Sequence, residues 1–565
     1  MAQFMDEYKR WLDCGLLSDE ERNELSDLSD EKEIEDRFYR ELEFGTAGMR
    51  GVLGIGRNRM NIYNVRRAAK GVAAFVKKMG TSEKGVLIGY DTRNFSRVFA
   101  EETAKTLAYE GVLAYLFDSV HSVPEVSFGV RELVCGAGVM ITASHNPKEY
   151  NGFKVYGPDG GQLPPEAAQI VIDAIESYDV FSDVSVMSFD EAKDKGLIKM
   201  VGEALNEKFL ETVKTQQINP ESVFAVADTM KLVYTPFHGS GSRPVKEILK
   251  RIGFKNVLVV AEQDNEDGNF PTVKSPNPEN AEGFYLAEKI AKENDVDLII
   301  GTDPDCDRVG ILVRDKNGDY KTLTGNQTGA LLVEYILRAR SESGKLPKDG
   351  VVIKTIVTTE LAAKIAKSYG IECMSLLTGF KYIGEKMTEF TEKKNHTFLI
   401  GFEESYGYLV GNHARDKDGV VATMLIAEMA AYYRNMGKTL YDALMEIYEK
   451  YGFYAERTVS FTMPGKDGMA RMSEILKNLR KSPVKSAIGL DVVKVTDFEY
   501  DKTGLPKSNV LKYELSDGKT YFIVRPSGTE PKIKLYIGTV SDSMENGAKL
   551  IDDLIKDIKN QMGIE

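Results

Sequence analysis

Short apolar segments alternate with segments whose apolar residues recur at helical spacing, in three successive rounds along this chain. The apolar segments that predict strands are 85–90, 112–117, 138–142, 231–235, 256–260, 298–300, 350–357, 371–376 and 397–401. The segments between them that predict helices are 99–110, 244–251, 282–294 and 360–369. Short strands that alternate with helices of this length are typical of α/β units. The pattern predicts three related α/β domains with mixed or parallel sheets.

The pattern changes after about residue 452. The segments 458–463, 511–515 and 520–525 mix apolar and polar residues in short alternation, as the strands of an antiparallel sheet do. We therefore expect a smaller C-terminal α+β domain, and a helical extension over the first forty residues. The predicted domains are 1–210, 211–325, 326–452 and 453–565.

The bulk composition narrows the class of protein. A chain of 565 residues, 42% of them hydrophobic, is long enough for several globular domains. Its net charge of −13 argues against nucleic acid as a general partner. We find no apolar run of about 18 residues that would span a membrane, and no secretory signal pattern. The four cysteines form no C-x-x-C pair or zinc set, so we expect a protein of the reducing cytoplasm.

Three aspartates at alternate positions follow a predicted buried strand. They are Asp303, Asp305 and Asp307, with Arg308 next in the chain. Carboxylates so close together repel one another unless a cation balances them, and oxygen ligands of this kind suit Mg²⁺. An EF-hand loop that starts at Asp303 would need glycine and glutamate where this chain has Arg308 and Arg314. A solvated acidic turn is the remaining alternative, and the strand before it and Arg308 after it argue against that alternative.

A serine loop, residues 142–147, also follows an apolar segment. Ser144 is a weak nucleophile unless a metal or a base activates it. His145 is a candidate to orient the transferred group. Lys154 is a candidate general acid or base, because a lysine near other cations or out of water can titrate near neutrality. Taken alone, the serine loop is more typical of an ordinary turn.

A third loop carries a carboxylate and a hydroxyl, Glu403 and Ser405, after the apolar segment that ends near residue 401. Their spacing of two suits hydrogen bonds to adjacent sugar hydroxyl groups, although helix caps use the same residue types. Arg50 lies in a glycine-rich turn, and Lys381 follows another predicted strand. These two basic residues are candidates to assist the site, and an ordinary surface position is the alternative for each.

A fourth loop predicts a phosphate site. It combines a guanidinium group, two hydroxyl groups and a glycine whose turn leaves backbone N–H groups free. Its residues are Arg525, Ser527, Gly528 and Thr529. An arginine can bind two phosphate oxygens at once. A rigid Pro/Gly turn between strands is the alternative.

With all four loops together, the chain resembles the α-D-phosphohexomutases, the family of phosphoglucomutases and phosphomannomutases. The matching segments are 142–147, 301–308, 401–405 and 525–531. They occur in the family's order, and the resemblance covers nearly the whole chain. The family's architecture is four domains around a deep central cleft, three of them α/β and the fourth smaller. The resemblance therefore implies the same architecture here.

The resemblance also implies a phosphoserine mechanism. Ser144 would carry a phosphoryl group and, with Asp303, Asp305 and Asp307, bind one Mg²⁺. The enzyme would donate the phosphoryl group to a sugar monophosphate. The resulting 1,6-bisphosphate would turn over in the cleft and return its other phosphoryl group to Ser144. The metal ion and the basic side chains would assist the phosphoryl transfer, while contacts to the distal phosphate would supply binding energy.

Individual residues match the family's functional positions. Lys154 matches the lysine proposed as general acid or base, and Arg50 matches the arginine near the transferred phosphoryl group. The residues that match the sugar-binding positions are Glu403, Ser405 and Lys381. The residues that match the loop holding the other phosphate are Arg525, Ser527, Gly528 and Thr529.

The third loop bears on the choice of sugar. Bacterial dual-specificity phosphomannomutases often carry Gly-Glu-Met-Ser-Gly-His there, whereas this chain has Glu404 for the methionine and Gly407 for the histidine. His413 is a candidate substitute for that histidine. The Glu-Glu-Ser form looks more like glucose-preferring enzymes, which implies conversion between glucose 1-phosphate and glucose 6-phosphate with glucose 1,6-bisphosphate as intermediate and activator.

Four alternatives stay open. A phosphomannomutase or a phosphopentomutase would use the same mechanism on another sugar phosphate. A non-catalytic sugar-phosphate-binding protein could have this fold. A metal-dependent hydrolase would also use clustered aspartates, but it would release inorganic phosphate.

Overall fold

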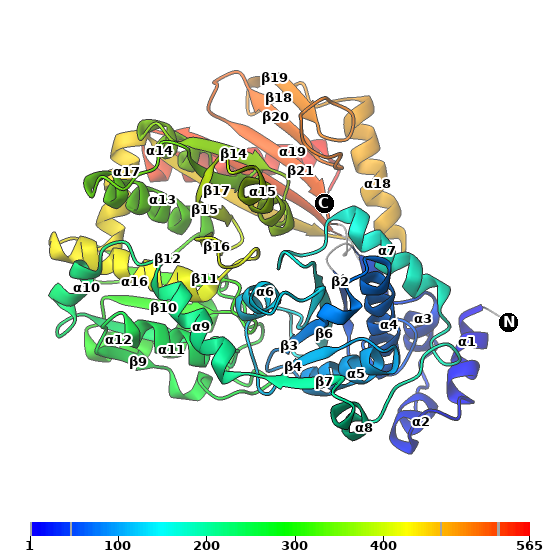
Figure 1. The fold of residues 1–565 in the computed structure, drawn as a ribbon. Helices are drawn as coiled ribbons and strands as arrows, with labels where there is room; N and C mark the ends of the chain where they lie inside the picture. The colour runs from blue at the N-terminus through cyan, green and yellow to red at the C-terminus, as the bar shows by residue number, and fades with distance from the viewer. Residues whose placement is uncertain (1–2, 46–47, 464–465, 528–531, 565) are drawn as a thin grey trace.

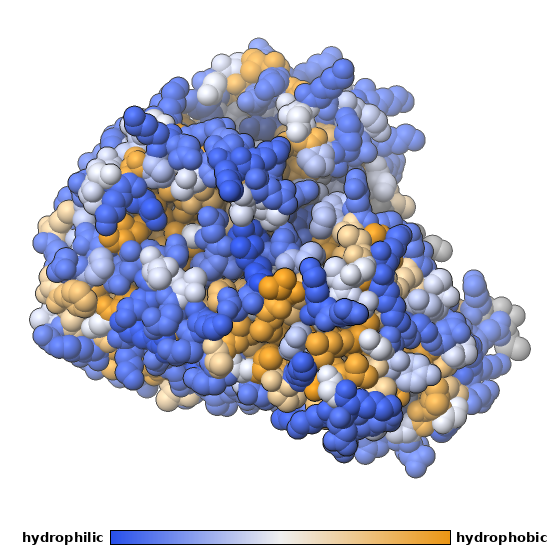
Figure 2. Space-filling view, viewed as in Figure 1, coloured by the Kyte–Doolittle hydropathy of each residue, from blue (hydrophilic) through white to orange (hydrophobic). Residues whose placement is uncertain are grey.

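Four β-sheets follow one another along the chain in the computed structural model, which describes residues 3–45, 48–463, 466–527 and 532–564. In Figure 1 they form an arc from the blue N-terminal domain through the green and yellow-green domains to the orange C-terminal domain. Three sheets are mixed and the fourth is antiparallel, which confirms three α/β domains and a C-terminal α+β domain. Figure 2 shows the surface hollowed between the C-terminal and N-terminal domains.

The first sheet has seven strands in the order β1-β2-β6-β5-β3-β4-β7. The strands are β1 (Phe44–Gly45), β2 (Gly48–Val52), β3 (Val86–Tyr90), β4 (Ala114–Phe117), β5 (Ala137–Ile141), β6 (Tyr150–Tyr156) and β7 (Ile198–Val201). The helices are α4 (Ile62–Lys78), α5 (Ser96–Tyr109), α6 (Val123–Glu132), α7 (Pro165–Ser177) and α8 (Phe189–Asp194). Because side chains alternate along a strand, Ile88 packs in the cluster that includes α4 and α5 while Leu87 packs with α6. Both faces of this sheet are therefore covered.

The N-terminal extension is helical, as predicted. Its helices are α1 (Gln3–Leu12), α2 (Asp19–Ser26) and α3 (Glu31–Phe38). Trp11 is fully buried and makes edge contacts with the rings of Phe38, Tyr63 and Phe181. This aromatic cluster fastens the extension to the first domain.

The second sheet has the order β12-β11-β10-β8-β9. Its strands are β8 (Lys231–Thr235), β9 (Asn256–Val259), β10 (Leu298–Thr302), β11 (Val309–Arg314) and β12 (Tyr320–Leu323). Helices α9 (Glu203–Lys214) and α10 (Pro220–Val226) precede it, and α11 (Ser242–Arg251) and α12 (Tyr285–Asn294) connect its strands. Strand β10 is buried throughout, because β8 and β11 pair with its two edges and helices cover its faces.

The third sheet has the order β14-β13-β15-β16. Its strands are β13 (Gly350–Thr355), β14 (Glu372–Leu376), β15 (Thr397–Glu403) and β16 (Gly407–Val410). Its helices are α13 (Gly325–Glu342), α14 (Glu360–Ser368), α15 (Phe380–Lys393), α16 (Gly419–Asn435) and α17 (Leu440–Tyr451). Helix α16 is buried over nearly its whole length, because it packs on β16 and also on α10 and α11 of the second domain.

The C-terminal sheet has the order β17-β22-β21-β20-β19-β18. Its strands are β17 (Phe453–Thr462), β18 (Ser486–Ala487), β19 (Leu490–Asp497), β20 (Leu511–Leu515), β21 (Tyr521–Pro526) and β22 (Lys532–Ser541), with helices α18 (Lys466–Lys481) and α19 (Met544–Gln561). An apolar cluster joins this domain to the third one through Ile356, Val357 and Leu377 on one side and Ile523 and Tyr536 on the other.

The three α/β sheets share one four-strand pattern. It reads β4-β3-β5-β6 in the first domain, β9-β8-β10-β11 in the second and β14-β13-β15-β16 in the third. In each, the first three strands are parallel and the last one turns back as an antiparallel hairpin. The hairpin loops carry Ser144, the three aspartates, and Glu404 with Ser405. Equivalent positions of the repeat therefore present the three predicted loops.

Within the part of the chain that the structure describes, we find no helix long and apolar enough to cross a membrane.

Candidate active site

Ser144 lies in the β5–β6 hairpin and points at the aspartate loop of the second domain. Its Oγ donates a hydrogen bond to Asp303 Oδ2 at 2.8 Å and lies 3.1 Å from His145 Nδ1. Its backbone is left-handed, with φ of 53°, which is uncommon for a residue other than glycine. Its N–H donates to Thr142 Oγ1 at 2.8 Å. The structure thus brings together the serine and the aspartates that the sequence predicted as partners.

The three aspartates form one buried cluster. Asp303, Asp305 and Asp307 each offer a ligand atom, and these atoms lie within 4.8 Å of one another. Burial and then the repulsion of the other two carboxylates raise the pKa of Asp303 well above its ordinary value. Asp305 Oδ1 and Asp307 Oδ1 are buried and accept no hydrogen bond from the described residues. Unpaired carboxylate oxygens fit a hard cation, so this group could bind a metal ion.

Two lysines face the cluster. Lys154 on β6 lies 2.8 Å from Asp305 Oδ2 and 3.4 Å from Asp307 Oδ2. Lys417 lies 3.0 Å from Asp307 Oδ2 and 2.9 Å from Asp416 Oδ1. Although burial opposes the ammonium form, the carboxylates of Asp305 and Asp307 leave the pKa of Lys154 raised. The near-neutral pKa expected for Lys154 is therefore wrong for this arrangement, because its neighbours are anions.

Sequence reasoning missed Lys417. It lies in the run Arg415 to Asp418 before α16, where alternating charges look like an ordinary solvated loop. The side chain is nevertheless buried, with only 9% exposed. Its stem passes over Gly407, since a Cβ at Gly407 would lie 2.1 Å from Lys417 Cδ. A side chain at position 407 would therefore collide with Lys417 unless the lysine moved.

The two arginine candidates contact the serine loop and the aspartate loop. Arg50 on β2 donates from Nη1 to Asn146 Oδ1 at 3.0 Å, so it reaches the serine loop from the neighbouring strand. Arg308 donates from Nη1 to Glu279 Oε1 at 2.7 Å, and its Nε lies 3.8 Å from Asp307 Oδ1. Burial, followed by the charge of Arg308, lowers the pKa of His145 well below its ordinary value. His145 is therefore a neutral imidazole beside the serine hydroxyl.

The third loop lies beside this cluster. Glu403 is buried, its Oε1 accepts a hydrogen bond from the backbone N–H of Gly379 at 2.9 Å, and its charge acts on Arg308. Ser405 is half-buried at the tip of the same hairpin. Lys381 is also half-buried at the start of α15, and burial lowers its pKa. Glu403, Ser405 and Lys381 thus come from two adjacent segments of the third domain.

His413 does not take the place of the missing histidine. Its Nε2 lies 2.6 Å from Asp418 Oδ2, and its ring packs near Phe209. Asp418 in turn caps α16 by accepting hydrogen bonds from the N–H groups of Val420 and Val421. The expectation for His413 is therefore wrong: the residue supports a helix start.

The predicted phosphate loop approaches the third loop from the C-terminal domain, since the charge of Arg525 acts on Glu404. Arg525 on β21 pairs with Lys534 on β22, and its Nη1 donates to Tyr536 Oη at 3.4 Å. The backbone N–H of Ser527 donates to the carbonyl of Lys532 at 2.8 Å. Burial and then the charge of Glu403 raise the pKa of Glu404 to about 7, and Lys534 and Arg525 oppose that shift. Gly528 and Thr529 lie outside the described residues.

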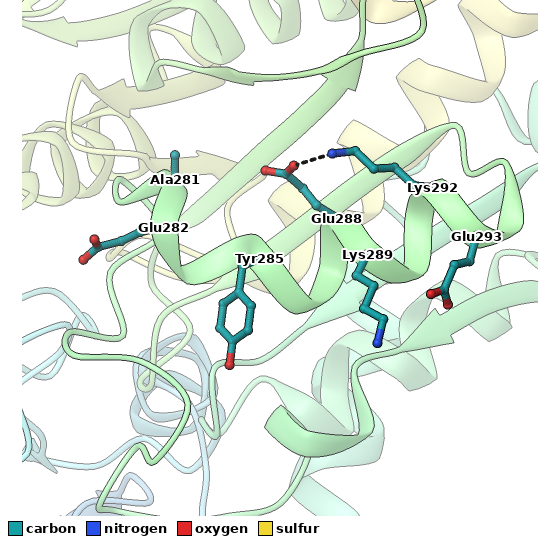
Figure 3. A pocket seen from close by; sticks show the side chains of 7 residues that line it. All are labelled: Ala281, Glu282, Tyr285, Glu288, Lys289, Lys292 and Glu293. Atoms are coloured by element: carbon teal, nitrogen blue, oxygen red, sulfur yellow. Dashed lines mark hydrogen bonds and ion pairs between the residues drawn. The ribbon is translucent and has the colours of Figure 1, made fainter.

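A surface pocket on the second domain lies apart from these loops. Figure 3 shows its side chains along α12 and the turn before it, with an ion pair of 3.3 Å between Glu288 and Lys292. The lining residues are Ala281, Glu282, Tyr285, Glu288, Lys289, Lys292 and Glu293. The pocket includes none of the predicted site residues, so we do not regard it as part of the site.

Family models match all four domains. The three models described as phosphoglucomutase/phosphomannomutase, alpha/beta/alpha domains I, II and III match residues 41–180, 207–318 and 324–451. The model of the family's C-terminal domain matches residues 461–553.

Similar proteins extend over almost the whole chain. A phosphoglucomutase of Staphylococcus haemolyticus is 37% identical over 524 residues, which cover 90% of this chain and 92% of the relative. A phosphoglucomutase of Staphylococcus saprophyticus is 35% identical over 526 residues, which cover 91% and 93%.

Solved structures share the fold at lower identity. A phosphoglucomutase/phosphomannomutase family protein from Burkholderia thailandensis has a TM-score of 0.66 and 17% identity, covering 92% of this chain and 97% of that one. The open form of pp63/parafusin, a phosphoglucomutase from Paramecium, has a TM-score of 0.69 and 17% identity, covering 92% and 95%. With four matching domain models in order and relatives of such identity and coverage, this chain belongs to the phosphoglucomutase/phosphomannomutase family, the α-D-phosphohexomutases.

Proposed function

We propose that this protein is a phosphoglucomutase that interconverts glucose 1-phosphate and glucose 6-phosphate through phosphoserine at Ser144 and glucose 1,6-bisphosphate. The observation that carries the proposal is the 2.8 Å hydrogen bond from Ser144 Oγ to Asp303 within the buried aspartate cluster. The relatives named phosphoglucomutase, at 35% and 37% identity, support glucose phosphates as the substrates.

In the proposed reaction, the bond between Ser144 Oγ and phosphorus breaks as a sugar hydroxyl oxygen bonds to the same phosphorus. The hydroxyl proton leaves to a base, and the serine oxygen gains a proton. Lys154 is protonated against Asp305 and Asp307, so it is the proposed acid: it gives its proton to the serine oxygen, and the proton released by the sugar hydroxyl then restores it. The return step exchanges these roles, so Ser144 receives the phosphoryl group from the other end of the bisphosphate.

Charge around the transferred group comes from several residues. Asp303, Asp305 and Asp307, with an oxygen at Ser144, would hold one Mg²⁺, which would offset negative charge on the phosphoryl group. Arg50 and Arg308 would bind its oxygens, and neutral His145 would orient the serine oxygen. We assign Lys417 to the same cluster because it neutralises Asp307.

The sugar and its second phosphate would be held on the side of the cleft formed by the third and C-terminal domains. Glu403, Ser405 and Lys381 are the proposed contacts to the sugar. The proposed contacts to the non-transferred phosphate are Arg525, Ser527, Gly528 and Thr529. Binding at this distance from the reacting group supplies orientation without taking part in the chemistry.

Turnover of glucose 1-phosphate to glucose 6-phosphate tests the proposal. The assay contains Mg²⁺ and a trace of glucose 1,6-bisphosphate, with mannose and ribose phosphates as parallel substrates and Ser144→Ala as the control. We expect the wild type to turn over the glucose phosphate strongly and the Ser144→Ala control to show no turnover. Faster turnover of mannose or ribose phosphate would mean that this sugar phosphate, and not the glucose phosphate, is the substrate. No turnover of any sugar phosphate by protein phosphorylated at Ser144 would favour a binding protein.

A further inference from the structure

The side chain of Arg93 hydrogen-bonds to the backbone of the serine loop. This buried side chain follows β3, and its guanidinium donates hydrogen bonds to the carbonyls of four residues of the loop. Nη2 donates to the carbonyl of Ser144 at 2.6 Å and to that of Asn146. Nη1 donates to the carbonyls of Pro147 at 2.9 Å and Tyr150 at 3.1 Å. One planar cation therefore fixes the loop from the nucleophile to the start of β6.

The serine loop needs such support. Ser144 is left-handed, a conformation that costs free energy for a residue with a Cβ and persists only where neighbours enforce it. Between β5 and β6 the loop forms its own backbone hydrogen bonds from Asn146 to Ala143 and from Tyr150 to Pro147. Because Arg93 bonds the carbonyl of Ser144 itself, it holds the peptide whose orientation sets the direction of the serine hydroxyl.

Arg93 is itself held on two sides. Asp91 Oδ2 lies 3.4 Å from Arg93 Nε, and Asp91 Oδ1 accepts from the backbone N–H of Arg93 at 3.0 Å. Phe270, from the second domain, places its ring 5.0 Å from the guanidinium carbon, within the range of a cation–π contact. Asn94 Nδ2 also donates to Asn269 Oδ1 at 3.1 Å. The arginine therefore lies where the domain that carries Ser144 meets the domain that carries the aspartates.

The segment that carries Phe270 also reaches the aspartate loop. His238 lies near Phe270 and hydrogen-bonds to Thr272 at 2.9 Å. In the same turn as His238, the N–H and Oγ of Ser240 donate to the carbonyl of Pro304 at 2.8 and 2.7 Å. A continuous set of contacts thus connects Arg93, under the serine loop, to the backbone between the first two aspartates.

We propose that Arg93 is a positioning residue, which holds the Ser144 loop in register with the aspartate loop, with Phe270 as its cap from the second domain. The proposal rests on the phosphoglucomutase function proposed above. Arg93 acts on the backbone and leaves the sugar contacts to other residues. Its loss should therefore lower kcat and leave KM for glucose 1-phosphate unchanged.

The test compares Arg93→Lys with Arg67→Lys. A lysine cannot reproduce the planar fork that serves four carbonyls. Arg67 is a buried arginine of α4 in the same domain whose Nη2 bonds Glu41 Oε2 at 2.7 Å instead. We expect kcat of Arg93→Lys to fall about 100-fold, the usual effect of a misplacement near 1 Å, with KM unchanged. Arg67→Lys should keep its kcat.

Hydrogen–deuterium exchange of residues 143–150 gives a readout that does not depend on activity. We expect faster exchange in Arg93→Lys and the wild-type rate in Arg67→Lys. Equal kcat and equal exchange in the two variants would overturn the positioning role. If Arg93→Lys does not fold, Phe270→Leu replaces it, and unchanged exchange in that variant would overturn the role as well. A wild-type protein without turnover would reject the proposed function, while exchange would still decide whether Arg93 holds the loop.

Discussion

Replacing Gly407 by alanine should displace Lys417 from the aspartate cluster. Gly407 begins β16, and a Cβ there would lie 2.1 Å from Lys417 Cδ and 2.8 Å from Cγ. Gly407 is outside the set of residues with positive φ, so its backbone accepts alanine without strain. The three atoms nearest to that Cβ all belong to the lysine stem, which passes over the glycine on its way to Asp307 and Asp416.

The size of the effect follows from these distances. Carbon atoms in contact lie about 3.5 Å apart, so the stem would have to retreat by roughly 1.4 Å. A shift of this size breaks the 3.0 Å contact to Asp307 and the 2.9 Å contact to Asp416. Loss of one partner from a buried ion pair lowers the free energy of unfolding by about 3–5 kcal/mol. A misplacement of 1 Å near a reacting group costs about 100-fold in rate, which is the loss of kcat that we expect.

The assay is turnover of glucose 1-phosphate by Gly407→Ala, with Gly15→Ala as the matched control. A Cβ at Gly15 would meet nothing within 4 Å, so that variant should behave as wild type. Lys417→Met should reproduce the loss seen in Gly407→Ala, because both changes take the Lys417 ammonium group away from Asp307. Wild-type kcat in Gly407→Ala would refute the reasoning that the contact of Lys417 with Asp307 supports turnover.

Three further predictions concern stability and the metal. Trp11→Ala should lower the free energy of unfolding by about 3–5 kcal/mol, measured as an earlier thermal transition, because the indole is fully buried in the aromatic cluster; an unchanged transition would contradict the anchoring role of the N-terminal extension. Mg²⁺ at about 100 times its dissociation constant should stabilise the wild type by about 2.7 kcal/mol in thermal unfolding, and an equal gain in Asp305→Asn would contradict the metal site. The pKa of Glu404, about 7 against an ordinary 4.5, means that the folded protein binds a proton that the unfolded chain releases. Stability should therefore fall as pH rises between these values, and chemical unfolding of Glu404→Gln should show a shallower fall; an identical slope would contradict that assignment.

Most of the predicted strands were confirmed because their signal is local. Segments 231–235 and 511–515 coincide with β8 and β20, and 350–357 contains β13. Strand β11 was not predicted, although Val309 to Val313 is apolar, because it follows the aspartate loop directly and its antiparallel pairing with β10 forms only in the folded chain. That hairpin is the reason why the sheets are mixed, since each α/β sheet ends in an antiparallel strand.

In the candidate site, too, some residues have a local sequence signal and others have none. The aspartates and Ser144 have sequence signals because each group stands directly after a buried strand, where ligands of α/β sheets bind. Lys417 has no such signal, since its contact with Asp307 depends on a loop of the third domain reaching the second. Arg93 also follows a predicted strand, 85–90, but the four carbonyls that it binds come next to it only in the folded protein.

The most direct test follows the phosphoryl group itself. Protein phosphorylated at Ser144 is mixed with an equal amount of glucose 6-phosphate and Mg²⁺, and the Ser144 peptide and the sugars are measured by mass spectrometry. We predict that phosphate leaves the peptide as glucose 1,6-bisphosphate appears in matching amount, followed by glucose 1-phosphate. Release of the same phosphate as inorganic phosphate, or transfer that continues in Ser144→Ala, would contradict a phosphoserine mutase.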